Sequence, residues 1–215
     1  MSPRKGLFVR LWTRKLHFYV GLYFLFFLWL FALSGLSLNR PGWKWLAPEF
    51  RTESVPTERS IPHPLPENDR AAAQLVMETL GLRGELHQTE RNLQTGTFKV
   101  WVHRPNRLYI ATVEQKTGRV VELGERRTNL WGVLRDLHTF NGVSTEDRSQ
   151  RRDWVFTTIW TLSMDALAVG IVFLVVSGLY LWIVRAGANR RWGIVALVAG
   201  TLLALWFLIG VPWLT

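Results

Sequence analysis

Histidine and aspartate are the residues of this sequence that could do chemistry inside a membrane, where ionisable groups are costly and are kept mainly for function. His17 is the only histidine within a long apolar run, and His138 closes the apolar face of a later amphipathic segment. Asp165 interrupts a second apolar run and is a candidate for a proton or metal-binding role. The alternatives are structural histidines with polar tips in the headgroup layer, and a boundary acid that is hydrated or paired with Arg.

The rest of the chain holds no motif for catalysis. It has no cysteine, which excludes thiol catalysis, thiolate metal sites and disulfides. Ser163 and Ser177 lie in no nucleophile motif, the glycines form no phosphate-binding loop, and no pair of acids has metal-ligand spacing. We therefore expect no independent enzymatic activity.

Three apolar runs are long enough to cross a bilayer, and they must position these residues. Residues 16–38 are 23 positions without Asp, Glu, Lys or Arg, and a helix of that length exceeds a hydrocarbon core of about 30 Å. Residues 154–184 end in an uncharged run of 19. Residues 193–214 have a Trp just before them and another near their end, as expected at the two membrane interfaces. The sequence predicts three transmembrane helices.

Positive charge is concentrated beside these spans. Residues 1–15 carry five Lys or Arg, residues 185–192 carry three, and neither segment holds an acid. Short basic loops stay in the cytoplasm, so we expect a cytoplasmic N-terminus, anionic lipids as partners at that face, and residues 39–153 on the periplasmic side. This distribution argues against nucleic-acid binding. A cleaved signal is the alternative for the first run, which exceeds the usual 7–15 apolar residues.

The segment between the first two spans predicts a small domain. Residues 39–68 contain six prolines and predict an extended linker over the membrane surface. Residues 69–124 predict an α+β module, with a helix that Asn68 or Asp69 begins and Gly81 ends, followed by three or four antiparallel strands. Residues 125–153 predict an interfacial amphipathic helix and a polar turn. The expected fold is an α-helical membrane protein with an inserted small α+β extracytoplasmic domain.

A pair of short motifs occurs twice. The pattern LHxxxG fits residues 16–21 and 137–142, and SGLxL follows it at residues 34–38 and 177–181. The two copies run through the membrane in opposite senses. In an antiparallel pair of spans, the small residues of one copy would therefore lie level with the histidine of the other. The four small residues, which we expect to serve helix packing, are Ser34, Gly35, Ser177 and Gly178.

In these motifs the sequence resembles the PepSY-associated transmembrane helix family, and residues 69–123 look like a PepSY domain. More distantly it is similar to siderophore-iron reductases of the bacterial inner membrane, which hold b-type haem between histidines of their spans. The resemblance implies a bacterial inner-membrane location, a redox or iron-uptake setting, and His17 and His138 as possible axial ligands of haem b. The space beside each histidine would suit a flat cofactor or an aromatic side chain such as Tyr19, Phe140 or Tyr180.

Two functions follow from these expectations. The first is an accessory protein without independent activity, whose periplasmic domain and spans dock a protein partner, a larger membrane complex or a second copy. The second is a haem-binding electron-transfer protein that reduces ferric iron, a siderophore or a periplasmic acceptor, as a ferric-siderophore-type reductase does. The second axial ligand would come from His63, His87 or His103 on the periplasmic side. On the cytoplasmic side it would come from another chain.

Overall fold

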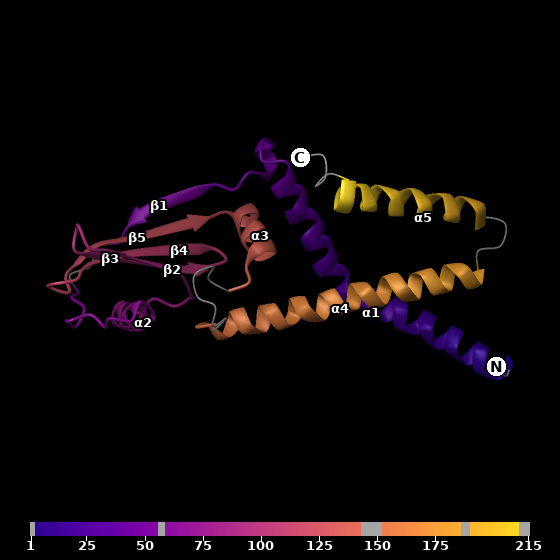
Figure 1. Cartoon of the computed structure of the whole chain (residues 1–215), viewed down its shortest axis with the longest axis horizontal. Coiled ribbons are helices and arrows are strands. Elements are labelled where there is room, and N and C mark those ends of the chain that lie inside the picture. Colours follow the sequence, from indigo (N-terminus) through magenta and orange to yellow (C-terminus); the bar gives the residue numbers. More distant parts are fainter. Residues whose placement is uncertain (1–2, 56–58, 143–151, 186–189, 211–215) are drawn as a thin grey trace. The chain divides into compact units, whose positions relative to one another are not determined.

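The structure is a computed structural model that describes residues 3–55, 59–142, 152–185 and 190–210 (Figure 1). Three helices in these ranges are long and apolar enough to cross a membrane, which confirms the three predicted spans. They are α1 (Pro3–Asn39), α4 (Val155–Arg185) and α5 (Arg190–Leu205), the last continued by a π-helical turn, Trp206–Gly210. Three parts of the expected segments lie outside the described residues: 143–151 in the polar turn, 186–189 in the basic turn, and 211–214 at the end of the third span.

The chain folds as two compact units. The first is Leu25–Leu167, and the second combines Met1–Phe24 with Ala168–Thr215. In the second of these, small residues let α1 and α4 approach closely. A Cβ atom added at Gly170 would overlap the ring of Phe24, and one at Gly21 would lie 3.7 Å from the Leu174 side chain. In α5 and its π-helical turn no described residue is buried.

The other unit contains an antiparallel sheet of five strands in the order β1-β5-β4-β3-β2. The central strands β3 and β4 pair from Thr97 with Glu114 to Arg104 with Arg107. Side chains along β3 alternate between buried and half-buried, as one covered face requires. The strands are β1 (Phe50–Ser54), β2 (Glu85–Asn92), β3 (Thr97–Arg104), β4 (Arg107–Glu114) and β5 (Val120–Thr128).

Helix α2 (Asp69–Leu80) packs on one face of this sheet and completes its core. The Asn68 side chain accepts a hydrogen bond from the Ala71 N–H at its start, and Gly81 ends it in the left-handed conformation at φ 69°. Both ends therefore lie where the sequence predicts. The core holds three strand residues with no exposed area, Phe98, Val100 and Val102, against Val76 of the helix.

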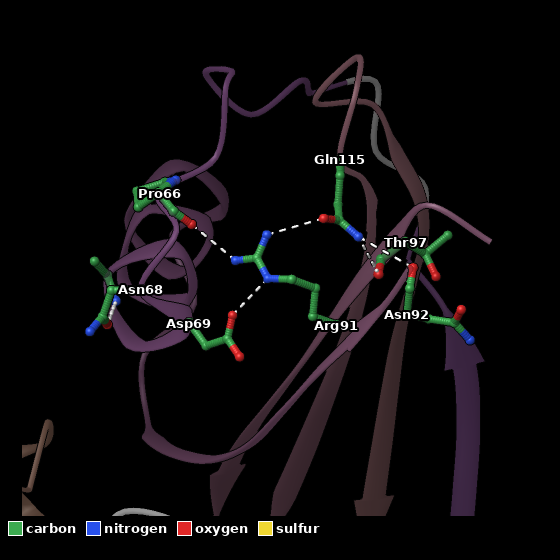
Figure 2. A network of polar contacts seen from close by, with 8 residues as sticks. Pro66, Asn68, Asp69, Arg91, Asn92, Thr97 and Gln115 are labelled. Carbon is green, nitrogen blue, oxygen red and sulfur yellow. Dashed lines mark hydrogen bonds and ion pairs between the residues drawn. The ribbon is translucent and has the colours of Figure 1, made fainter. Parts of the chain in front are cut away.

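Arg91 joins three segments at the edge of the sheet (Figure 2). Its Nε donates to the Asp69 carboxylate at 2.8 Å, and its two terminal nitrogens donate to the Pro66 carbonyl at 2.9 Å and to Gln115 at 3.1 Å. Its guanidinium also lies 4.9 Å from the centre of the Phe98 ring. One side chain thus holds the start of α2, the segment before it and the β4–β5 turn together.

Residues 39–68 are not only a linker, which corrects part of the expectation for this segment. They form the short 3-10 turn η1 (Lys44–Leu46) and strand β1, which pairs with β5 along its whole length. Ile61 and Leu65 enter the core. Prolines exclude helix interior but allow an edge strand, and the side chains of β1 are all exposed, so no alternating pattern marks it.

The boundary expected at residue 125 is also wrong. Strand β5 continues to Thr128 and α3 (Leu130–Thr139) follows it. The last residues of β5 are charged or polar, so they carry no apolar alternation. Their strand conformation comes from backbone pairing with β1 and β4 on both sides.

Candidate functional site

His17 lies on α1 and contacts a serine of α4 in the same unit. Its Nδ1 is 2.7 Å from the hydroxyl oxygen of Ser177. The neighbouring residue, Gly178, leaves room for the ring, because a Cβ there would lie 3.4 Å from the imidazole Cε1. We call the hydrogen-bonded residues His17 and Ser177, together with the neighbouring Gly178, the His17 pair.

His138 lies near the end of α3. It contacts a serine of α1, and both residues belong to the unit Leu25–Leu167. Its Nδ1 is 2.8 Å from the hydroxyl oxygen of Ser34, and a Cβ at Gly35 would lie 3.6 Å from Cε1. We call His138, Ser34 and Gly35 the His138 pair. Its ring also packs against Phe31 at a centroid distance of 4.9 Å, and Trp160 of α4 stacks on Phe31 at 6.4 Å.

The serines decide which ring nitrogen carries the proton. The Ser177 hydroxyl donates its single hydrogen to the Phe173 carbonyl at 2.6 Å, and the Ser34 hydroxyl donates to the Phe31 carbonyl at 3.1 Å. Each serine oxygen can then only accept from the histidine, so Nδ1 of His17 and of His138 is the protonated nitrogen. In the neutral ring this leaves the lone pair on Nε2.

Nε2 is the atom that would bind a metal. In the part of the chain that the structure describes, Nε2 of His17 and of His138 has no hydrogen-bond partner, and neither atom is among the buried unpaired ones. A hydrogen bond donated by the other ring nitrogen, here Nδ1–H to the serine oxygen, is the usual way in which proteins fix the orientation of a ligating histidine. Both pairs therefore present an oriented imidazole nitrogen at the protein surface.

The repeated motif thus predicts the partners of both histidines. Ser34 and Gly35 meet His138, and Ser177 and Gly178 meet His17, as the inverted order of the two copies requires. The sequence does not identify Phe31 as the aromatic neighbour of His138. Its position three residues before Ser34, one helical turn away on the same helix, is the signal that could have found it.

The other candidate axial ligands do not join His138. His63 lies beside Gly118, at the β4–β5 turn, whereas α3 follows the opposite end of β5. His103 lies 3.6 Å from Asp136, which is two positions from His138 and hence about 200° around the helix. Its ring packs instead on His87, at a centroid distance of 5.6 Å.

A small cavity lies beside His87 and His103. It measures about 110 Å³ and is also lined by Glu85 and by residues 139–142. Sites for organic ligands usually measure about 300–1,000 Å³, so this cavity is too small for a tetrapyrrole. Among the described residues no group of three or more His, Asp or Glu has the geometry of a metal site.

Asp165 lies on an exposed side of α4, and no described residue pairs with it. Among the described residues, no Arg therefore forms the ion pair with Asp165 that was one of the expected alternatives. A proton or metal-binding role for Asp165 stays a prediction.

Glu85 is a residue that sequence reasoning missed. Glu85 is the first residue of β2 and is 2% exposed. Its carboxylate accepts hydrogen bonds from the backbone N–H groups of Asp153 at 2.8 Å and Trp154 at 3.1 Å. The Asp153 carboxylate in turn accepts from Arg70 of α2 at 2.7 Å. Together these bonds, the Glu85 clamp, fix the start of α4 to the sheet.

Burial raises the pKa of the Glu85 carboxyl above its ordinary value, although the two backbone donors oppose that effect. Glu125 on β5 shows the opposite shift: hydrogen bonds from Arg127 lower its pKa. Neither group touches a histidine pair directly. The two pKa shifts therefore affect the stability of the fold rather than the chemistry of the histidine pairs.

The fold and the two pairs define an integral membrane protein with a five-stranded α+β domain between its first and second spans. The family model described as PepSY-associated TM region matches residues 14–214. The chain belongs to this family, which confirms the family resemblance of the sequence motifs. The searches of curated proteins and of solved structures found no match.

Proposed function

We propose that this protein is a transmembrane electron-transfer subunit in which Nε2 of His17 and Nε2 of His138 each bind the iron of a b-type haem. The observation that supports this most is the shared hydrogen-bond direction. Both serines donate to a backbone carbonyl, which leaves the imidazole lone pair on Nε2 in both pairs. A haem bound there would supply one-electron redox chemistry.

The surroundings of each Nε2 are compatible with a flat ring system. The glycine beside each histidine keeps one side of the imidazole free of a side chain, at the distances given above. The Phe31 ring packs on His138 at an interplanar angle of 44°. The donor set is therefore one neutral imidazole for each site, which is the axial ligand that b-type haem accepts.

One imidazole is half of a bis-histidine site. Since the described residues place no second histidine beside either pair, we infer that a partner protein or a second copy of this chain supplies the other ligand. The protein is then an accessory subunit without independent activity. With its partner it reduces ferric iron, a siderophore complex or another acceptor on the periplasmic side.

The charge distribution supports an orientation for this path. Residues 1–15 contain five Lys or Arg and no Asp or Glu, so the N-terminus lies on the cytoplasmic side of a bacterial inner membrane. The His17 pair then lies nearer the cytoplasmic face, where electrons would enter. The His138 pair lies nearer the periplasmic face, where they would leave.

An accessory protein that docks its partner without haem is the second candidate. The exposed apolar surface of α5 and of the π-helical turn that continues it, where Trp192, Leu202 and Leu208 are 76%, 62% and 73% exposed, favours it. Such a surface contacts either lipid or another membrane helix. In this function the two histidine pairs only hold helices together.

Haem titration separates the two candidates. The apo protein in mild detergent is titrated with haemin, and oxidised and dithionite-reduced spectra are recorded for wild type, His17→Ala, His138→Ala and the control His63→Ala. We expect haemin to bind wild type and His63→Ala, seen as a shift of the Soret band away from that of free haemin, with about half of the bound haem lost in each of the other two variants. Absence of this shift in wild type, or equal haem in all four proteins, would overturn the proposal.

A further inference from the structure

A cluster of large apolar side chains lies exposed immediately after the first span. Trp43, Trp45 and Leu130 are 41%, 63% and 69% exposed. The rings of Trp43 and Trp45 stack at 5.5 Å, and Trp45 meets Trp131 edge-on at 6.2 Å. We call Trp43, Trp45 and Leu130, together with the half-buried Trp131, the tryptophan patch. Contiguous exposed surface of this kind marks a site of interaction.

The patch is fixed to the end of the span rather than carried on a loose loop. The membrane-spanning part of α1 is Gly6–Asn39, so the span and the helix end at the same residue. In its last turn, the Ser37 hydroxyl donates to the carbonyl of Leu46, in η1, at 2.9 Å. Leu46 itself is 1% exposed. Because η1 is tied to the helix at this bond, Trp43 and Trp45 stay beside the boundary at which α1 leaves the membrane.

The α3 part of the patch is tied to the same place. The Asn129 side chain caps α3 by accepting from the Gly132 N–H at 3.1 Å, and it also donates to the Ala47 carbonyl at 3.3 Å. Leu130 and Trp131 follow directly after Asn129. The patch is therefore one surface built from two segments that are far apart in sequence.

Cations accompany the aromatic rings. The guanidinium of Arg40 lies 5.9 Å from the centre of the Trp43 ring, and Lys44 lies between the two tryptophans in sequence. Residues 37–48 contain no acid. Tryptophan and basic side chains together suit the headgroup layer, which offers carbonyl and phosphate oxygens above hydrocarbon.

We propose that the tryptophan patch inserts into the lipid headgroup layer at the membrane face that α1 reaches at Asn39, with Arg40 and Lys44 beside lipid phosphates. The patch holds this end of the sheet, and the start of α3 with it, against the bilayer. The argument depends on continuity with the span and on charge, and not on the haem proposal.

The opposite end of the sheet provides a matched control. Leu93, in the β2–β3 turn, is 84% exposed but stands alone among polar residues. It lies one strand length away, because β3 runs from that turn to the end of the sheet where His103 lies 3.6 Å from Asp136 of α3. An eight-residue strand spans about 26 Å, so Leu93 should lie outside the headgroup layer.

The test uses the absence of cysteine from the chain. Full-length Trp45→Cys, Leu130→Cys and Leu93→Cys are labelled with an environment-sensitive NBD probe and reconstituted in phosphatidylcholine vesicles with nitroxide at the headgroup or at acyl carbon 12. We expect labels at 45 and 130 to show blue-shifted emission and at least twofold quenching by headgroup nitroxide. We expect less quenching at carbon 12, and neither effect at 93.

Two outcomes would overturn the proposal. Water-like emission without quenching at both 45 and 130 would leave the patch free for a protein partner. Equal quenching at 45 and 93 would mean that the sheet lies along the membrane without using the patch. A variant that unfolds is recognised by its circular dichroism, and since 45 and 130 lie on different segments, either label can decide the question.

Discussion

The His17 pair and the His138 pair make the same contacts with different elements. The Nδ1–Oγ distances are 2.7 and 2.8 Å, and both serines donate to a carbonyl of their own helix. In one pair the histidine is on α1 and the serine on α4. In the other the serine is on α1, and the histidine is on the ten-residue helix α3. What the repeat preserves is therefore the hydrogen bond, and not the type of helix that carries the imidazole.

Their support also differs. His17 lies in a long helix, and its partner Ser177 lies in another. His138 depends on a series of contacts: Glu85 holds the start of α4, Trp160 of α4 stacks on Phe31, and Phe31 packs on His138. The difference teaches that the His138 pair should respond to changes in the sheet, whereas the His17 pair should not.

Removal of the Glu85 clamp is expected to have the largest effect on this comparison. Glu85→Ala leaves the half-buried backbone N–H groups of Asp153 and Trp154 without this acceptor, which costs about 3 kcal/mol. We expect a lower thermal midpoint by circular dichroism. In ¹⁵N spectra of the histidine-labelled apo protein, the Nδ1–H signal of His138 should broaden and that of His17 should not. Equal broadening of both signals would refute the asymmetry of support.

Leucine at the two glycines should disturb each pair separately. In Gly35→Leu and Gly178→Leu the new side chain must occupy space next to Cε1 of His138 or His17, and overpacking costs about 2 kcal/mol. Each variant should shift the imidazole signals of its own histidine only, and it should lower haem binding at that site. The controls are Gly35→Ala and Gly178→Ala, since a Cβ alone makes ordinary contacts at 3.6 and 3.4 Å.

The sequence predicts much of this arrangement, and its failures have physical causes. Apolar length identifies the spans, and a cap and a glycine identify both ends of α2. The repeat predicts which serine meets which histidine. Strand β1 escapes prediction because its five side chains are all exposed and only backbone pairing defines it.

The Glu85 clamp could not be found from sequence. Its acceptor, Glu85, and its donors, Asp153 and Trp154, are almost seventy positions apart, and backbone N–H groups leave no mark on residue type. Phe31 escapes for a different reason. The aromatic residues of α1 are many, so Phe31 could be selected only through its spacing of one helical turn from Ser34, the predicted partner of His138.

Alanine at the two serines is expected to have a smaller effect. Ser34→Ala and Ser177→Ala each remove one side-chain hydrogen bond, worth about 1 kcal/mol in a membrane protein. Without its acceptor, Nδ1 loses its preference for the proton, so the ¹⁵N shifts of that histidine should approach those of a mixture of tautomers. The Thr variants, which keep the hydroxyl, should behave like wild type. Unchanged shifts in the Ala variants would disprove the assigned tautomer.

The pH dependence of the clamp is the smallest expected effect. Because the pKa of Glu85 is raised from 4.5 in the folded state, the folded protein binds more protons than the unfolded chain just above pH 4.5. Its free energy of unfolding therefore falls as pH rises from there through the folded pKa. Glu125 acts in the opposite sense and in a different range: its lowered pKa stabilises the fold above 4.5, and that contribution is lost as pH falls.

The difference between wild type and Glu85→Gln isolates the first of these contributions, because both proteins keep Glu125. The thermal midpoint of wild type minus that of the variant should decrease with rising pH above 4.5, and it should level off once Glu85 is ionised in both states. The Nδ1–H signal of His138 should weaken over the same range, while that of His17 should stay constant. A difference that rises with pH would show that the two backbone donors outweigh burial at Glu85, and the clamp would then hold α4 more firmly in its ionised form.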